Sequence, residues 1–179
     1  MRKGSASRGT SRQAPSWWCL PFAAALLVCA WSGREAMAES PAAAPDFALR
    51  ALDGHNYRLS EYRGDVVAVI FWASWCGGCR SELERLDRLQ GIYRDAGFQV
   101  LGVTVDESPD LARSVAAGIG VGFPQLHDAD KSVSKTYRPD KLPTTFFVDR
   151  GGIVRFTYGE LDSRDERAVL GELRRLLDE

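Results

Sequence analysis

An unbroken run of seven apolar residues, Val66 to Trp72, precedes a pair of cysteines at positions 76 and 79. A strand of this composition has no polar face, so it needs cover on both sides, as in a parallel or mixed sheet flanked by helices. Beyond the cysteines, Leu83, Leu86 and Leu89 recur at helical spacing. The order strand, dithiol, helix is the strongest constraint on the fold of this chain.

The rest of the chain alternates between strand and helix patterns. Strands are predicted at 98–105, 123–126, 144–148 and 153–158, and helices after Cys79, after Ser108-Pro109, over 132–137 and from the capping-box spacing at 163–166. Asp53-Gly54 and Arg150-Gly151-Gly152 are typical of hairpin turns. Alternation that ends in a hairpin predicts an α/β fold, with a mixed central sheet and helices on both faces.

The first 38 residues have the order of a secretion signal. Basic residues precede the uncharged stretch Gln13–Gly33, and Ala36-Met37-Ala38 is a small-x-small cleavage pattern. We therefore predict a signal peptide over 1–38, an Ala/Pro-rich mobile tether over 39–45 and one folded domain over 46–179. Export to the periplasm is the expected consequence.

Two alternatives would keep this segment on the exported protein. The 21 uncharged residues come close to the ~20 that span a bilayer, so an uncleaved membrane anchor remains open. Cys29 follows Leu26-Leu27-Val28 and offers a lipidation site, although Val28 is bulkier than the small residue that usually precedes a lipidated cysteine.

Charge and cysteine content narrow the class of protein. A cut after Ala38 leaves 141 of the 179 residues, with 18 basic and 23 acidic side chains and a net charge of −5. The chain therefore lacks the excess of basic residues that is typical of a nucleic-acid-binding protein. Cys76 and Cys79 are then the only thiols, which excludes a disulfide-dense scaffold.

The Trp75-Cys76-Gly77-Gly78-Cys79 segment connects the buried strand to the helix. A cysteine at a helix N-terminus has a lowered thiol pKa, because the helix dipole favours the thiolate that attacks disulfides. Cys76 would attack and Cys79 would resolve the mixed disulfide, while the glycine pair lets a bulky partner approach. A zinc site or a purely structural disulfide are the alternatives, and Arg80 replaces the histidine that haem attachment needs.

Glu82 and Pro143 each allow two interpretations. Glu82 lies on the apolar stripe of the helix, where a desolvated carboxylate would have a raised pKa and could carry protons for Cys79. It would otherwise be an exposed first-turn acid. Pro143 precedes a predicted strand, and its bond to Leu142 is either cis, with backbone exposed beside the dithiol, or an ordinary trans turn.

Together these motifs resemble the thioredoxin superfamily, and within it the exported TlpA/ResA-like thiol-disulfide oxidoreductases, which include DsbE/CcmG. The segments that carry the resemblance are Pro45-Asp46-Phe47, Phe71 to Cys79, Arg80-Ser81-Glu82, Phe123-Pro124 and Leu142 to Phe146. The resemblance implies a thioredoxin-like fold with an N-terminal β extension and a central insertion between Asp106 and Thr144. The Gly-Gly dipeptide and the polar segment 138–141 depart from the usual pattern of the group.

By the same resemblance, Cys76 is the attacking thiol, Cys79 the resolving thiol, Glu82 the buried acid and Pro143 the cis-proline. The residues expected to contact substrate are Trp75, Gly77, Gly78, Leu142 and Thr144. The predicted activity is reduction of disulfides in exported client proteins of the cytochrome c or oxidase assembly type. Electrons would come from a membrane thiol donor, without a metal or organic cofactor, and the oligomeric state is left open.

Two other functions stay open. A peroxiredoxin-like peroxidase is the first, although Val69 and Ala73 stand where the Pro-x-x-x-Thr-x-x-Cys pattern has proline and threonine. The second is a non-catalytic dithiol domain for copper(I), although no methionine remains after a cut at Ala38 to support a soft ion.

Overall fold

The structure is a computed structural model that describes residues 42–160 and 165–179. The predicted signal peptide, residues 39–41 of the predicted tether, and Ser163 and Arg164 of the predicted capping box lie outside the described residues.

A five-stranded mixed sheet forms the centre of the domain, in the order β5-β4-β3-β6-β7. The strands are β3 (Val66–Trp72), β4 (Phe98–Thr104), β5 (Gln125–His127), β6 (Thr144–Val148) and β7 (Val154–Tyr158). β3 lies parallel to β4 and antiparallel to β6, and β6 and β7 form the predicted hairpin. The predicted thioredoxin-like α/β fold with a mixed central sheet is confirmed.

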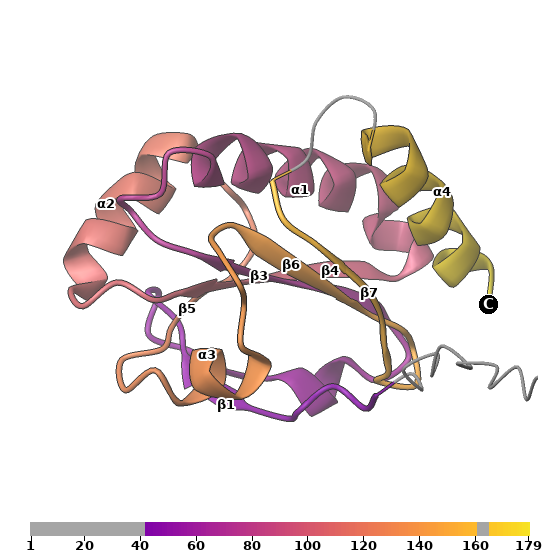
Figure 1. Cartoon of the computed structure of the whole chain (residues 1–179), viewed down its shortest axis with the longest axis horizontal. Coiled ribbons are helices and arrows are strands. Elements are labelled where there is room, and N and C mark those ends of the chain that lie inside the picture. Colours follow the sequence, from indigo (N-terminus) through magenta and orange to yellow (C-terminus); the bar gives the residue numbers. More distant parts are fainter. Residues whose placement is uncertain (1–41, 161–164) are drawn as a thin grey trace, which may run out of the picture. The chain divides into compact units, whose positions relative to one another are not determined.

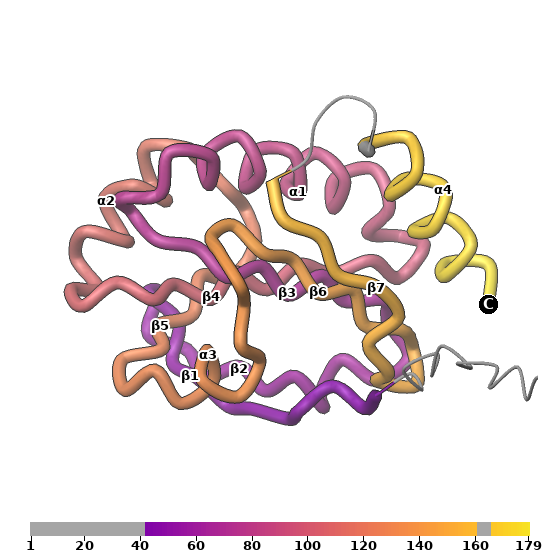
Figure 2. Tube along the Cα trace, viewed as in Figure 1, coloured from indigo at the N-terminus to yellow at the C-terminus, as the bar shows by residue number. Residues whose placement is uncertain are grey.

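Both faces of the sheet are covered (Figure 1). The helices α1 (Cys79–Tyr93), α2 (Pro109–Ile119) and α4 (Asp165–Asp178) lie on one face. On the other face lie α3 (Ser132–Tyr137) and the antiparallel hairpin of β1 (Ala48–Arg50) and β2 (Asn56–Arg58). This hairpin is the predicted N-terminal β extension, and the Cα trace in Figure 2 shows it beside β5 and α3.

β3 divides the apolar core into two halves. All seven of its residues are buried, and they alternate between the two faces. Ala68 and Ile70 pack with Leu83 and Leu86 of α1, whereas the alternate residues, Val69 and Phe71, pack with groups on the α3 side. Since neither half is closed without helices from distant parts of the chain, the buried strand organises the whole domain.

The segment before the hairpin differs from the predicted tether. Ala42 accepts a hydrogen bond from Val154, Ala44 donates one to Gly152, and Pro45 accepts one from the Tyr137 hydroxyl. Ala44 is buried as well. The prediction of a mobile tether is therefore wrong for residues 42–45, because the small Ala/Pro side chains let the backbone dock along the β6–β7 turn.

Within the described ranges, 42–160 and 165–179, no helix has the length and apolar content needed to cross a membrane.

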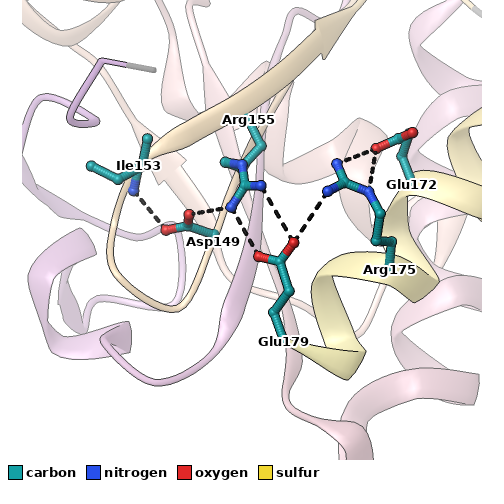
Figure 3. Close-up of polar contacts among 6 residues, drawn as sticks. All are labelled: Asp149, Ile153, Arg155, Glu172, Arg175 and Glu179. Atoms are coloured by element: carbon teal, nitrogen blue, oxygen red, sulfur yellow. Dashed lines mark hydrogen bonds and ion pairs between the residues drawn. The ribbon is translucent and has the colours of Figure 1, made fainter. Parts of the chain in front are cut away.

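A cluster of charged side chains joins the β6–β7 turn to the end of α4 (Figure 3). Arg155 donates hydrogen bonds to Asp149 at 2.9 Å and to Glu179 at 2.9 Å, and Glu179 also pairs with Arg175 at 3.2 Å. Burial alone raises the pKa of Asp149, but hydrogen bonds from the Ile153 N–H and from Arg155 outweigh it and hold the pKa below its ordinary value.

Asp149→Asn should therefore destabilise the domain in a pH-dependent way. The carboxylate stabilises the fold above the unfolded-state pKa of ~3.9, and this contribution is lost as the pH falls through the lower folded-state value. We expect a loss of about 1 kcal/mol in the free energy of unfolding at pH 7, shrinking toward zero near pH 2, in urea titrations. Asp178→Asn, at an exposed position of α4, is the control. A loss that stays constant with pH would contradict the assigned ionisation.

Candidate active site

Cys76 and Cys79 form a disulfide directly after β3, with 5.4 Å between their Cα atoms. Cys79 is only 1% exposed, whereas Cys76 is partly exposed. α1 begins at Cys79, so Cys76 precedes the helix instead of lying in its first turn, and the Cys79 N–H donates to the Cys76 carbonyl. One sulfur is thus open to a partner and the other is enclosed.

A buried carboxylate fixes the turn that leads to the cysteines. Asp106 is 2% exposed and accepts hydrogen bonds from the Ser74 N–H at 2.9 Å and the Ser74 hydroxyl at 2.7 Å. The Thr104 hydroxyl donates to the same carboxylate at 2.7 Å. Asp106 therefore ties the loop after β3 to the end of β4. This role of Asp106 was not predicted from sequence, because only the pairing of the two strands brings Ser74 and Asp106 together.

Glu82 lies in the first turn of α1, three residues after Cys79, and is 1% exposed. The inward orientation, one of its two interpretations, is confirmed. The Tyr158 hydroxyl donates to Glu82 Oε1 at 3.0 Å, and Arg85 Nη1 lies 3.3 Å from Oε2. Burial raises the pKa of Glu82 above its ordinary value, and Arg85 and Tyr158 reduce that rise without cancelling it. A carboxyl group in this state exchanges a proton closer to neutral pH than a surface glutamate does.

The partners of Glu82 come from separate elements. Tyr158 ends β7, 76 residues further along the chain, and burial together with Glu82 raises its pKa, so that its hydroxyl remains a donor. Arg85 extends the cluster toward Glu166 of α4, with 4.0 Å between Arg85 Nε and Glu166 Oε1. Arg85 alone could have been suspected from sequence, through its i,i+3 spacing to Glu82.

The Leu142–Pro143 peptide bond is cis, which confirms the interpretation that the resemblance favoured. Thr144 pairs with Phe71 near the end of β3, so Pro143 lies level with the residues that lead to Cys76. Pro143 is buried and Leu142 is half-buried. Thr144 differs from its predicted substrate-binding role, because its side chain is buried and its hydroxyl donates to the Lys141 carbonyl.

The remaining residues predicted to contact substrate differ in how accessible they are to a bound partner. Trp75 is 72% exposed, and a Cβ atom at Gly77 would meet open space. A Cβ at Gly78 would lie 2.6 Å from the Glu160 carboxyl group, so Glu160 fills the space beside this glycine. The open approach predicted for both glycines therefore exists at Gly77 alone. Glu160 was missed because it comes from the chain after β7.

Among the residues that the structure describes, no three His, Cys, Asp or Glu side chains are grouped as a metal site.

Known proteins resemble this chain in both sequence and structure. The AhpC/TSA family model matches residues 41–157. Thiol-disulfide oxidoreductase ResA of Bacillus subtilis is 30% identical over 132 residues, which are 73% of each chain. ResA of Geobacillus kaustophilus is 39% identical over 112 residues, or 63% of this chain, and the match spans 64% of that protein's length.

A solved structure agrees with these matches. The crystal structure of a protein from Chlorobium tepidum, provisionally described as thiol:disulfide interchange protein DsbE, superimposes with a TM-score of 0.73 at 32% identity. The superposition covers 76% of this chain and 96% of that one. The family match over 41–157 includes the segment that carries both cysteines.

Tyr158→Phe should raise the pKa of Glu82 further, because it removes a hydrogen bond that stabilises the carboxylate. We also expect the free energy of unfolding to fall by about 1–2 kcal/mol. Titration of the Glu82 carboxyl carbon by NMR measures the first effect. Tyr93→Phe is a matched control, since Tyr93 lies at the far end of α1 from Glu82 and its hydroxyl accepts a hydrogen bond from Arg174 of α4. A Glu82 midpoint that stays the same or falls in Tyr158→Phe would show that the hydroxyl does not stabilise the carboxylate.

Proposed function

The chain belongs to the AhpC/TSA family of thioredoxin-like proteins, and from this membership and its site we propose that it is a thiol-disulfide oxidoreductase that reduces client disulfides. The observation that carries the proposal is the Cys76–Cys79 disulfide, with one accessible and one buried sulfur, three residues from the buried Glu82. The ResA relatives and the DsbE-like structure support it.

In the first step, the Cys76 thiolate of the reduced protein attacks one sulfur of a client disulfide. A bond forms between Cys76 Sγ and that sulfur, the client S–S bond breaks, and the second client sulfur leaves as a thiolate. Cys76 is suited to this step because it is the accessible member of the pair and precedes the start of α1, whose dipole favours negative charge.

In the second step, Cys79 resolves the mixed disulfide. Its thiolate attacks Cys76 Sγ, the bond to the client breaks, and the client leaves with both sulfurs reduced, having taken up two electrons and two protons. Glu82 accepts the proton that Cys79 must lose, because burial raises its pKa above the ordinary value and makes its carboxylate a stronger proton acceptor than a surface glutamate. The cycle uses no metal or organic cofactor.

Location and partners complete the proposal. The secretion signal predicted over residues 1–38 supports work outside the cytoplasm, in the periplasm, where a membrane thiol donor would return two electrons to the Cys76–Cys79 disulfide. Clients of the cytochrome c or oxidase assembly type fit the resemblance to the TlpA/ResA-like group. Pro143 and Leu142 would position the client backbone beside Cys76.

A peroxidase is the second candidate, since the matched family model is AhpC/TSA. Ala73 argues against it, because a methyl group cannot polarise a peroxide as the hydroxyl of the expected threonine would, and Val69 replaces the proline of the same pattern. Rapid consumption of hydrogen peroxide by the reduced protein, without reduction of a peptide disulfide, would favour the peroxidase. Tight copper(I) retention without any reductase activity would instead favour a binding domain.

Cys79→Ser should trap the intermediate of the first step. With a peptide that contains one intramolecular disulfide, we expect a covalent adduct at Cys76 that is visible by mass spectrometry and released by dithiothreitol. Turnover should fall by at least about 10³-fold, because resolution then depends on an outside thiol. Cys76→Ser, which keeps the buried thiol, is the control and should form no adduct. Turnover of Cys79→Ser at the rate of the parent protein would overturn the assignment of the two thiols.

A further inference from the structure

A groove of about 610 Å³ lies beside the disulfide on the α3 side of the sheet. It begins at Trp75 and Leu142, the residues that precede Cys76 and the cis-proline Pro143. Val105 and Pro139 add apolar wall. Trp75 and Leu142 therefore place one edge of this groove next in sequence to the attacking cysteine and to the cis-proline.

Three cations line the groove, Lys131, Lys135 and Arg138, and its lining includes no acidic residue. Residues 39–179 together carry a net charge of −5, so this is a local positive site on an acidic protein. The Lys131 ammonium donates to the backbone carbonyls of Val105 and Asp106, which places it in the floor. Lys135 and Arg138 are exposed.

The backbone at both ends of α3 is unusual. Lys131 and Arg138 flank the helix at φ angles of 61° and 49°, and within 42–160 and 165–179 they are the only non-glycine residues with positive φ. This conformation is disfavoured for residues that carry a Cβ atom, and such strain concentrates at binding sites. The two residues with this conformation, Lys131 and Arg138, also contribute positive charge to the groove.

We propose that the groove binds an acidic segment next to the reactive cysteine of the client protein. This inference rests on the proposed reductase function and names the class of substrate. Carboxylates of an extended segment would face Lys135 and Arg138, while Trp75 offers its exposed ring to an apolar side chain nearer the cysteine. Opposite charges across the contact raise the association rate and discriminate between partners.

The test uses the reduced full chain and three synthetic peptides with the same intramolecular disulfide. Their three flanking residues are acidic, amide or lysine. We expect kcat/KM to be roughly tenfold higher for the acidic peptide than for the amide peptide, and lowest for the lysine peptide. The preference should shrink near 1 M salt, where the Debye length falls to about 3 Å. Equal rates, or a preference for the amide or lysine flank, would overturn the proposal.

Charge reversal identifies the surface responsible. Lys135→Glu/Arg138→Glu should invert the preference, whereas Arg88→Glu/Arg167→Glu, which changes the net charge equally at exposed positions of α1 and α4, should keep it. Retention of the acidic preference by the groove variant would also overturn the proposal. Lys135→Gln/Arg138→Gln removes the two positive charges without reversing them. It should therefore abolish the preference without inverting it.

A small uncharged disulfide, hydroxyethyl disulfide, separates this inference from the proposed function. Every charge variant should still reduce it, since the cysteines are intact, and Arg88→Glu/Arg167→Glu should do so at the parental rate. If the parent protein reduces neither this compound nor any peptide, the reductase function itself is wrong. If it reduces all of them without a charge preference, only the groove proposal fails.

Discussion

Burial of β3 on both faces is the constraint on which the other parts of the structure depend. A strand without a polar side needs cover from two layers, and here α1, α2 and α4 supply one while α3 and the N-terminal hairpin supply the other. The same strand ends just before Cys76. The core and the reactive disulfide are therefore built from one segment, so the packing that stabilises the fold also sets the position of the dithiol.

The second organising contact is the one around Glu82. Removal of a carboxylate from water is unfavourable unless charge and hydrogen bonds compensate for it. Arg85 and Tyr158 compensate in part, and the raised pKa of Glu82 reflects the remainder. Because the compensation is incomplete, the carboxyl group is able to take up and release a proton beside a redox pair. If neighbouring groups compensated its negative charge completely, a carboxylate in the same place would stay ionised and would not exchange protons.

Local pattern was enough to predict the parts of the fold that local physics decides. Seven apolar residues specify β3, Pro109 marks the start of α2, and glycine turns mark both hairpins. The contacts of Asp106 with Ser74, and of Tyr158 with Glu82, depend on strand pairing across the chain, which spacing does not show. Gly78 illustrates the same limit, since its free side is closed by Glu160 from the chain after β7. The docking of residues 42–45 was not predicted, because it depends on backbone hydrogen bonds that the alanine and proline side chains do not reveal.

The docking of Ala42 and Ala44 on the β6–β7 turn has a consequence for how the domain is held. Val148 at the end of β6 pairs with Val67 near the start of β3, so this turn and Cys76 are at opposite ends of the strand. β3 has seven residues, and at a rise of about 3.3 Å per residue it puts about 20 Å between them. Residue 42 therefore lies at the end of the sheet that carries the β6–β7 turn, opposite to Cys76. A client protein that contacts Cys76 therefore meets the domain at the end opposite to residue 42.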